Sequence, residues 1–119
     1  MITELFIKQC EQAEEIQEGW KPEEYDIFTY DGTSLFRYPL VKRTKEWMAK
    51  HAPIWLPTQE QLQEMIEEKH IYYLIIKLQR FQVEHTIGLG INNMNELWLA
   101  FVMYKKYHKV WTGEKWEGR

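Results

Sequence analysis

The fold is decided by residues 93–106, which read NMNELWLAFVMYKK. Asn93 followed by Glu96 is a signal for the start of a helix, because a short polar side chain accepts a hydrogen bond from the first turn. Residues 97–104 are apolar on nearly every side of such a helix, a pattern typical of a buried position. We therefore expect a central helix here, with Trp98 in the core.

A second apolar stripe lies at the start of the chain. Apolar residues over 3–19 recur at steps of three or four, the spacing that lines one face of an α-helix. Thr3 is placed to cap this helix, and Gly19 to end it in a left-handed conformation. Cys10 falls on the apolar stripe, so we interpret it as a small buried hydrophobic residue rather than a reactive thiol.

Residues 25–38 change to a pattern of β-branched and aromatic residues around Asp31-Gly32. This dipeptide is a strong hairpin signal, because both residues of the tight turn must tolerate positive φ. The sequence predicts a two-stranded ribbon that ends at Pro39. A lone hairpin is marginally stable in water, so we expect it to pack on helices.

Two further helices are predicted in the middle of the chain. Residues 41–52 are expected to form a short basic helix, and residues 54–57 a linker. Thr58 with Gln61 then makes a capping box, which starts a helix that runs to about Lys69.

Residues 71–87 are compatible with either a helix or strands. Their apolar residues fit one helical face, yet the same residues are β-branched or aromatic, and some alternate as in a strand. A hairpin would need a tight turn near Gln79-Arg80, whose side chains are poor at positive φ. This comparison favours a helix through about Val83.

Together these patterns predict an α+β fold. We expect a mainly helical single domain over residues 1–119, with four to five helices and a small β-hairpin in its N-terminal half. The tail is expected to turn so that Trp116 lies near Trp111. The sequence shows neither a bilayer-spanning apolar run nor a secretory leader, and its one cysteine cannot form an intrachain disulfide, so a cytoplasmic protein with no membrane contact is expected.

No constellation of catalytic residues is visible. The only serine, Ser34, lies beside a predicted turn, and Cys10 is on an apolar stripe, so a hydrolase triad is not favoured. Glu67 and His70 have the spacing used in di-iron bundles, but a single copy is too few for such a site. We expect no catalytic residue, no metal site and no cofactor.

Two clusters of basic and aromatic residues are candidate binding surfaces. The formal charge of the chain is −3, so neither cluster reflects an overall basic protein. Such clusters can hold a single-stranded nucleic acid, anchor a protein interface, or simply cover the edge of the core with lysine stems. The candidate residues are Arg37, Lys42, Arg43, Lys45, Trp47, Lys50, Lys105, Lys106, Lys109, Trp111 and Trp116.

Three stretches in the last half of the chain carry a family resemblance. These are residues 54–65 (IWLPTQEQLQEM), 96–103 (ELWLAFVM) and 107–116 (YHKVWTGEKW). They resemble small uncharacterised proteins encoded by phages and prophages of Gram-positive bacteria. The resemblance implies a phage or prophage origin and a cytoplasmic setting, with no catalytic residue to carry over.

The function expected from the sequence is that of a non-enzymatic accessory protein that binds a phage or host protein. The alternative is an accessory module that binds single-stranded nucleic acid, and this binding would weaken steeply with added salt. Nothing in the sequence indicates an oligomeric state.

Overall fold

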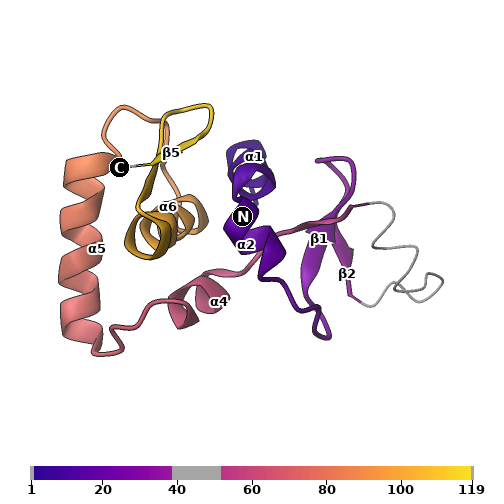
Figure 1. Cartoon of the computed structure of the whole chain (residues 1–119), viewed down its shortest axis with the longest axis horizontal. Helices are drawn as coiled ribbons and strands as arrows, with labels where there is room; N and C mark the ends of the chain where they lie inside the picture. Colours follow the sequence, from indigo (N-terminus) through magenta and orange to yellow (C-terminus); the bar gives the residue numbers. More distant parts are fainter. Residues whose placement is uncertain (1, 39–51, 119) are drawn as a thin grey trace. The chain divides into compact units, whose positions relative to one another are not determined.

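The computed structural model describes residues 2–38 and 52–118 (Figure 1). Contacts cluster into two compact units, Ile2–Pro57 and Thr58–Arg119. The described residues contain five helices and two small antiparallel sheets, so the predicted α+β class is confirmed. The single domain stays a prediction, and the helix predicted over 41–52 falls, except for Ala52, outside the described residues.

Two short helices begin the N-terminal unit: α1 (Glu4–Gln12) and α2 (Glu14–Glu18). Thr3 caps α1 as predicted, because its hydroxyl accepts a hydrogen bond from the amide of Phe6 at 3.1 Å. The prediction of one continuous helix is wrong at Ala13, where ψ is 75°. Gly19 is also not left-handed, with φ at −77°.

The break at Ala13 is stabilised by the side chain of Gln17. Its amide nitrogen donates to the carbonyl oxygen of Cys10 at 3.0 Å and to that of Trp55 at 2.9 Å. Its amide oxygen accepts from the backbone N–H of Trp55 at 2.7 Å. The side chain therefore occupies the place that a neighbouring strand would take beside Trp55, and it gives a second donor to the Cys10 carbonyl, which already accepts from the Ala13 amide.

A three-stranded sheet completes this unit. Its order is β2 (Phe36–Arg37), β1 (Ile27–Thr29) and β3 (Ile54–Trp55), all antiparallel. The predicted hairpin is confirmed, but the prediction of a tight two-residue turn within it is wrong. Residues 30–35 form a wider loop, because the Asp31 carboxylate accepts from the amides of Thr33 and Ser34. Strand β3 lies in the segment that we predicted to be a linker.

The C-terminal unit is built around α6 (Met94–Tyr107), which contacts α4 (Gln59–Glu64), α5 (Ile71–His85) and β4 (Lys109–Trp111) (Figure 1). The central position of α6 is as predicted. Most of its apolar residues are buried, with Phe101 at 0% exposure and Trp98 at 4%. Asn93 caps α6 by accepting from the amide of Glu96 at 2.9 Å.

The other predictions for this unit are partly confirmed. The capping box of Thr58 and Gln61 is present at the start of α4. This helix ends earlier than the predicted Lys69, whose ammonium reaches back to donate to the carbonyl of Glu64 at 2.8 Å. The ambiguous segment is helical and forms α5, as favoured.

The tail folds back on itself as predicted. Strand β4 pairs with β5 (Trp116–Gly118), and Trp111 lies opposite Trp116 with their ring centroids 5.0 Å apart. His108 ends α6 in a left-handed conformation, with φ at 55°. In the parts of the chain that are described, there is no helix both long and apolar enough to span a bilayer.

Candidate functional site

Helix α5 is apolar on two opposite faces. One face carries Leu74, Leu78 and Phe81, each at most 9% exposed, and it packs toward α6. A second stripe follows positions 72, 76, 79 and 83, at steps of four, three and four. Because a residue turns by about 100° along a helix, this stripe lies opposite the buried one. It is exposed to solvent.

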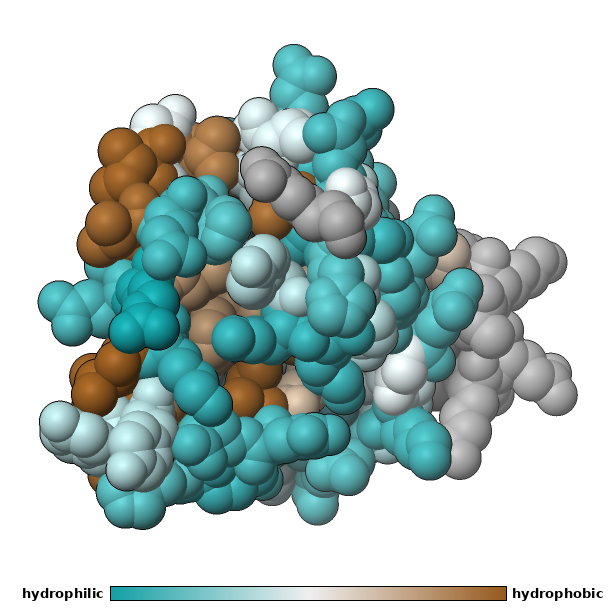
Figure 2. Space-filling view, turned by 60° about the vertical axis from the view of Figure 1, so that its left-hand side comes forward, coloured by the Kyte–Doolittle hydropathy of each residue, from teal (hydrophilic) through white to brown (hydrophobic). Residues whose placement is uncertain are grey.

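We call the exposed apolar surface of this helix the α5 outer face. Tyr72 is 62% exposed and Val83 64%, and the other members are exposed to between 37% and 60%. Figure 2 shows hydrophobic side chains at the surface on the side where Figure 1 draws α5. The apolar residues of the face are Ile71, Tyr72, Tyr73, Ile75, Ile76 and Val83.

The size of this face distinguishes it from scattered surface hydrophobic residues. A large side chain that is about half exposed contributes about 100 Å², so the three apolar residues of the outer stripe, Tyr72, Ile76 and Val83, together expose roughly 300 Å². The largest apolar patch on a typical monomer is about 300 to 600 Å² and is often functional. The outer stripe therefore lies at the lower end of this range.

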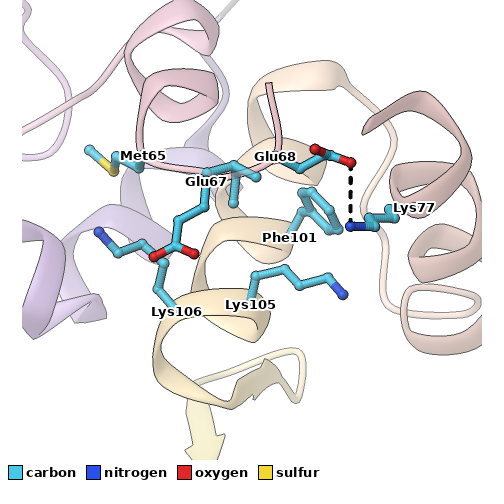
Figure 3. Close-up of a pocket in the computed structure, with 8 residues that line it drawn as sticks. Met65, Glu67, Glu68, Lys77, Phe101, Lys105 and Lys106 are labelled. Carbon is cyan, nitrogen blue, oxygen red and sulfur yellow. Dashed lines mark ion pairs between the residues drawn. The ribbon is translucent and has the colours of Figure 1, made fainter. Parts of the chain in front are cut away.

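The charged side chains of α5 lie beside the outer stripe, and Arg80 lies between Ile76 and Tyr73 around the helix. Lys77 forms an ion pair with Glu68 at 3.7 Å, on the side of the helix that looks toward α6 (Figure 3). Arg80 and Glu84 are both exposed. By their positions along the helix, they lie between the buried stripe and the outer stripe. The central line of the outer face has only Gln79 as a polar residue.

A pocket of about 310 Å³ adjoins the same unit, where the segment after α4 meets α5 and α6 (Figure 3). Its charged residues are three lysines and two glutamates. The ammonium of Lys105 lies 5.9 Å from the ring centroids of both Phe101 and Tyr104, within the range of a cation–π contact. The lining residues are Met65, Ile66, Glu67, Glu68, Lys77, Phe101, Lys105 and Lys106.

The pocket is lined by charged and apolar side chains. Its titratable side chains are only lysines and glutamates. The single cysteine of the chain lies elsewhere: Cys10 is completely buried, and burial raises the pKa of its thiol well above the usual range. A raised pKa suppresses the reactive thiolate. Within residues 2–38 and 52–118, no three metal-ligating side chains gather at one place.

The residues predicted from the sequence as a binding surface fall in different places. Arg37 belongs to the N-terminal unit, where its guanidinium donates to the carbonyl oxygen of Tyr25 at 3.2 Å. Lys105 and Lys106 are exposed and line the pocket together. Lys109 is half-buried in β4. The predicted Lys42, Arg43, Lys45, Trp47 and Lys50 lie outside the described residues.

The prediction that Trp111 is a surface ring is wrong. This residue is only 3% exposed, because strand β4 turns it inward and Trp116 covers it. Trp116 remains partly exposed. Lys115, which neighbours them in the sequence, forms an ion pair with Glu117 at 3.9 Å. The C-terminal cluster therefore does not present two stacking rings to a ligand.

Sequence reasoning missed the α5 outer face. We aligned the apolar residues of this segment on one helical face only, which left Tyr72, Ile76 and Val83 without a role. The signal was present: these three residues also follow a helical spacing, on the opposite side. A helix with two apolar stripes needs cover on both sides.

Comparison with known proteins does not place the chain in a family. The resemblance to phage and prophage proteins therefore stays a prediction. No protein-family model, no curated protein and no solved structure matches this chain.

Proposed function

We propose that this chain is a phage- or prophage-encoded accessory protein of the cytoplasm, which acts by binding a phage or host protein and not by catalysis. The observation that carries the proposal is the α5 outer face, whose central stripe of Tyr72, Ile76 and Val83 exposes roughly 300 Å² of apolar surface on a regular helix. Exposing an apolar surface of this kind to water is unfavourable, and a partner that covers it removes this penalty.

The energetics of burial support a specific partner. Covering roughly 300 Å² of apolar surface is worth about 7.5 kcal/mol at 25 cal/mol per Å². Association itself costs about 4 to 15 kcal/mol in lost translational and rotational freedom. The two terms are similar in size, so binding through this face depends on a partner with a complementary apolar surface. Tyr72 and Tyr73 are suitable anchors, because tyrosine contributes a large contact area with few rotatable bonds.

The proposal is tested by capture with matched baits. A tagged chain is incubated with lysate of a Gram-positive bacterium that also contains an untagged copy of the chain. The substitution Tyr72→Glu places a charge on the outer face, and Lys77→Gln changes the charge of the same helix by the same amount beside the pocket. We expect at least one protein to be enriched by the original and by Lys77→Gln, and lost with Tyr72→Glu.

Each captured protein is then purified and its affinity for the three baits is measured directly. An affinity at least tenfold lower for Tyr72→Glu than for Lys77→Gln is expected from removing a central apolar anchor. If all three baits enrich the same proteins with equal affinity, the outer face does not bind protein and the proposal fails.

A single-stranded nucleic acid is the alternative partner. The observation that favours it is a pair of exposed lysines beside aromatic rings: Lys105 lies near the ring of Tyr104, and Lys106 lies near the ring of Tyr107. This reading predicts binding of a fluorescent single-stranded DNA or RNA at low salt, weakened steeply by added salt and by Lys105→Gln with Lys106→Gln. An absence of binding at low salt would remove it.

A further inference from the structure

We infer that the pocket of the C-terminal unit binds a small apolar molecule that carries a single negative charge, such as an aromatic carboxylate, and that Lys105 holds this charge. The inference goes beyond protein binding, because it concerns a surface other than the α5 outer face. Three properties of the pocket support it: its apolar floor, its volume and the charge that its rim leaves unbalanced.

The floor of the pocket is apolar and belongs to the core. Ile66 and Phe101 line it and are buried, so the packing of the unit fixes their positions. Met65 also lines the pocket and is half-buried, and its flexible side chain adapts to the shape of a ligand. The carbon stems of the lysines on the rim add further apolar wall. The pocket therefore offers contact to an apolar body and not only to a charge.

The volume of the pocket fits a small molecule. A cavity of about 150 Å³ lined by apolar side chains takes one benzene ring. This pocket has a volume of about 310 Å³, so it has room for two fused rings or an aliphatic body of similar size. Sites for small molecules have volumes of about 300 to 1,000 Å³, and this pocket lies at the low end.

The rim of the pocket leaves one positive charge unbalanced. Lys77 and Glu68 form an ion pair and neutralise each other. Figure 3 shows Glu67 and Lys106, which have opposite charges, toward the other side of the pocket. Lys105 has no carboxylate partner among the residues that the structure describes, and it accounts for the difference between three lysines and two glutamates.

Aromatic rings, and not a carboxylate, position the ammonium of Lys105. It lies 5.9 Å from the ring centroids of Phe101 and Tyr104, and both of these rings pack against Phe81. A ring contact leaves the N–H groups of the ammonium able to donate to an anion. The dipole of α6 favours a lysine at this position, as it does at position 106, but it requires neither the apolar floor nor the ring contacts.

These properties together favour an apolar monoanion over other small ligands. One unbalanced ammonium neutralises one carboxylate. A phosphate monoester carries about −1.5 to −2 charges at neutral pH and would leave negative charge beside the two glutamates. An apolar cation would be repelled by Lys105, and a neutral molecule would gain nothing from it.

The test is a titration of the isotope-labelled full chain with naphthoate, followed by the nuclear magnetic resonance shifts of its backbone amides. Naphthamide is the second probe, because it has the same two rings and no charge. We expect saturable shifts at Met65, Ile66 and Lys105. The affinity for naphthoate is expected to be at least threefold higher than for naphthamide, as one partly exposed ion pair provides.

Three variants identify the group that holds the charge. Lys105→Gln is expected to abolish the preference for naphthoate over naphthamide, whereas Lys105→Arg, which keeps the charge, retains it. Lys115→Gln is the matched control, because it removes the same charge from an exposed lysine of the same unit that does not line the pocket. The ratio of the two affinities reports on charge alone, since a general loss of packing would weaken both probes together.

Four results would overturn the inference: no saturable shift, equal affinity for the two probes, a preference that survives Lys105→Gln, or the largest shifts on the α5 outer face. The proposed function fails independently, because capture of a protein does not involve these probes. If naphthoate does not bind but Tyr72→Glu abolishes capture, the inference is wrong and the proposed function stands. If naphthoate binds as expected and no bait differs in capture, the reverse holds.

Discussion

Replacing Gln17 is expected to destabilise the N-terminal unit. Among the partly exposed polar side chains of its helices, Gln17 is the one whose replacement is expected to cost most. The amide of Gln17 makes three hydrogen bonds to backbone atoms, with lengths from 2.7 to 3.0 Å. Each contributes about 1 kcal/mol net, and the partners left without a bond add to the loss. For Gln17→Ala we therefore expect a decrease of about 3 kcal/mol in the free energy of unfolding.

The assay is urea denaturation followed by tryptophan fluorescence. With a slope of about 2 kcal/mol per M urea, a loss of 3 kcal/mol lowers the midpoint by about 1.5 M. Glu18→Ala serves as the control, because it removes an exposed side chain from the same helix. Hydrogen exchange gives a local measurement: the amide of Trp55 donates to Gln17 and is expected to lose protection in Gln17→Ala but not in Glu18→Ala.

A second variant separates the hydrogen bonds from the packing of the side chain. Gln17→Glu keeps the acceptor for the Trp55 amide but faces two carbonyl oxygens with a carboxylate, which raises the pKa of the introduced group. A raised pKa gives stability that is present at low pH and is lost as the pH rises through it. We expect Gln17→Glu to approach the original stability in acid. If Gln17→Ala unfolds at the same urea concentration as Glu18→Ala, the bridging role of this amide is refuted.

Three other predictions concern the core, a helix cap and a loop. Phe101 is completely buried, so Phe101→Ala is expected to cost about 3 to 5 kcal/mol in urea denaturation, whereas a cost below 1 kcal/mol would show that the C-terminal unit is not packed around it. Asn93→Ala removes the hydrogen bond to the amide of Glu96 and is expected to cost about 1 kcal/mol, which Asn93→Ser should largely restore. Backbone amides of Ser34 and Thr33 hold the pKa of Asp31 well below its usual range, so its contribution is present at neutral pH and is lost as the pH falls through that lowered pKa. Thermal denaturation should accordingly show Asp31→Asn as less stable than the original at pH 7 and the difference shrinking in acid; a constant difference would contradict this.

Much of the fold could be predicted because its signals are local. The caps at Thr3, Thr58 and Asn93 depend on side chains within three residues of the amides they bind, so spacing alone identifies them. The central helix was predictable for the same reason, since a run that is apolar on all sides has to be buried. These elements need no knowledge of distant contacts.

The errors have a common cause in long-range contacts. The helix breaks at Ala13 because Gln17 bonds to Trp55, 38 residues further along the chain. Strand β3 is only two residues long and exists because β1 pairs with it, so its own sequence does not identify it. No helical spacing could have indicated either feature.

The candidate site was less predictable than the fold. Choosing one apolar face for α5 was correct for its packing against α6, but the second stripe is not packed within the C-terminal unit and therefore gave no signal in a search for core residues. The burial of Trp111 depends on the pairing of β4 with β5, which brings Trp116 over it. The sequence suggested that the Trp111 ring lies at the surface, whereas the pairing of β4 with β5 buries it.

The indole pairs of the two units provide optical probes of folding. Trp20 and Trp55 are stacked with their ring planes at 4° and centroids 5.9 Å apart, and Trp111 and Trp116 are tilted at 60°. Closely spaced indoles couple their electronic transitions, so each pair has a near-ultraviolet signature that disappears when its rings separate. Exchanging Trp20 or Trp116 for phenylalanine would silence one pair at a time. Melting curves of the two variants would then show whether both halves of the polypeptide lose their structure in one cooperative step.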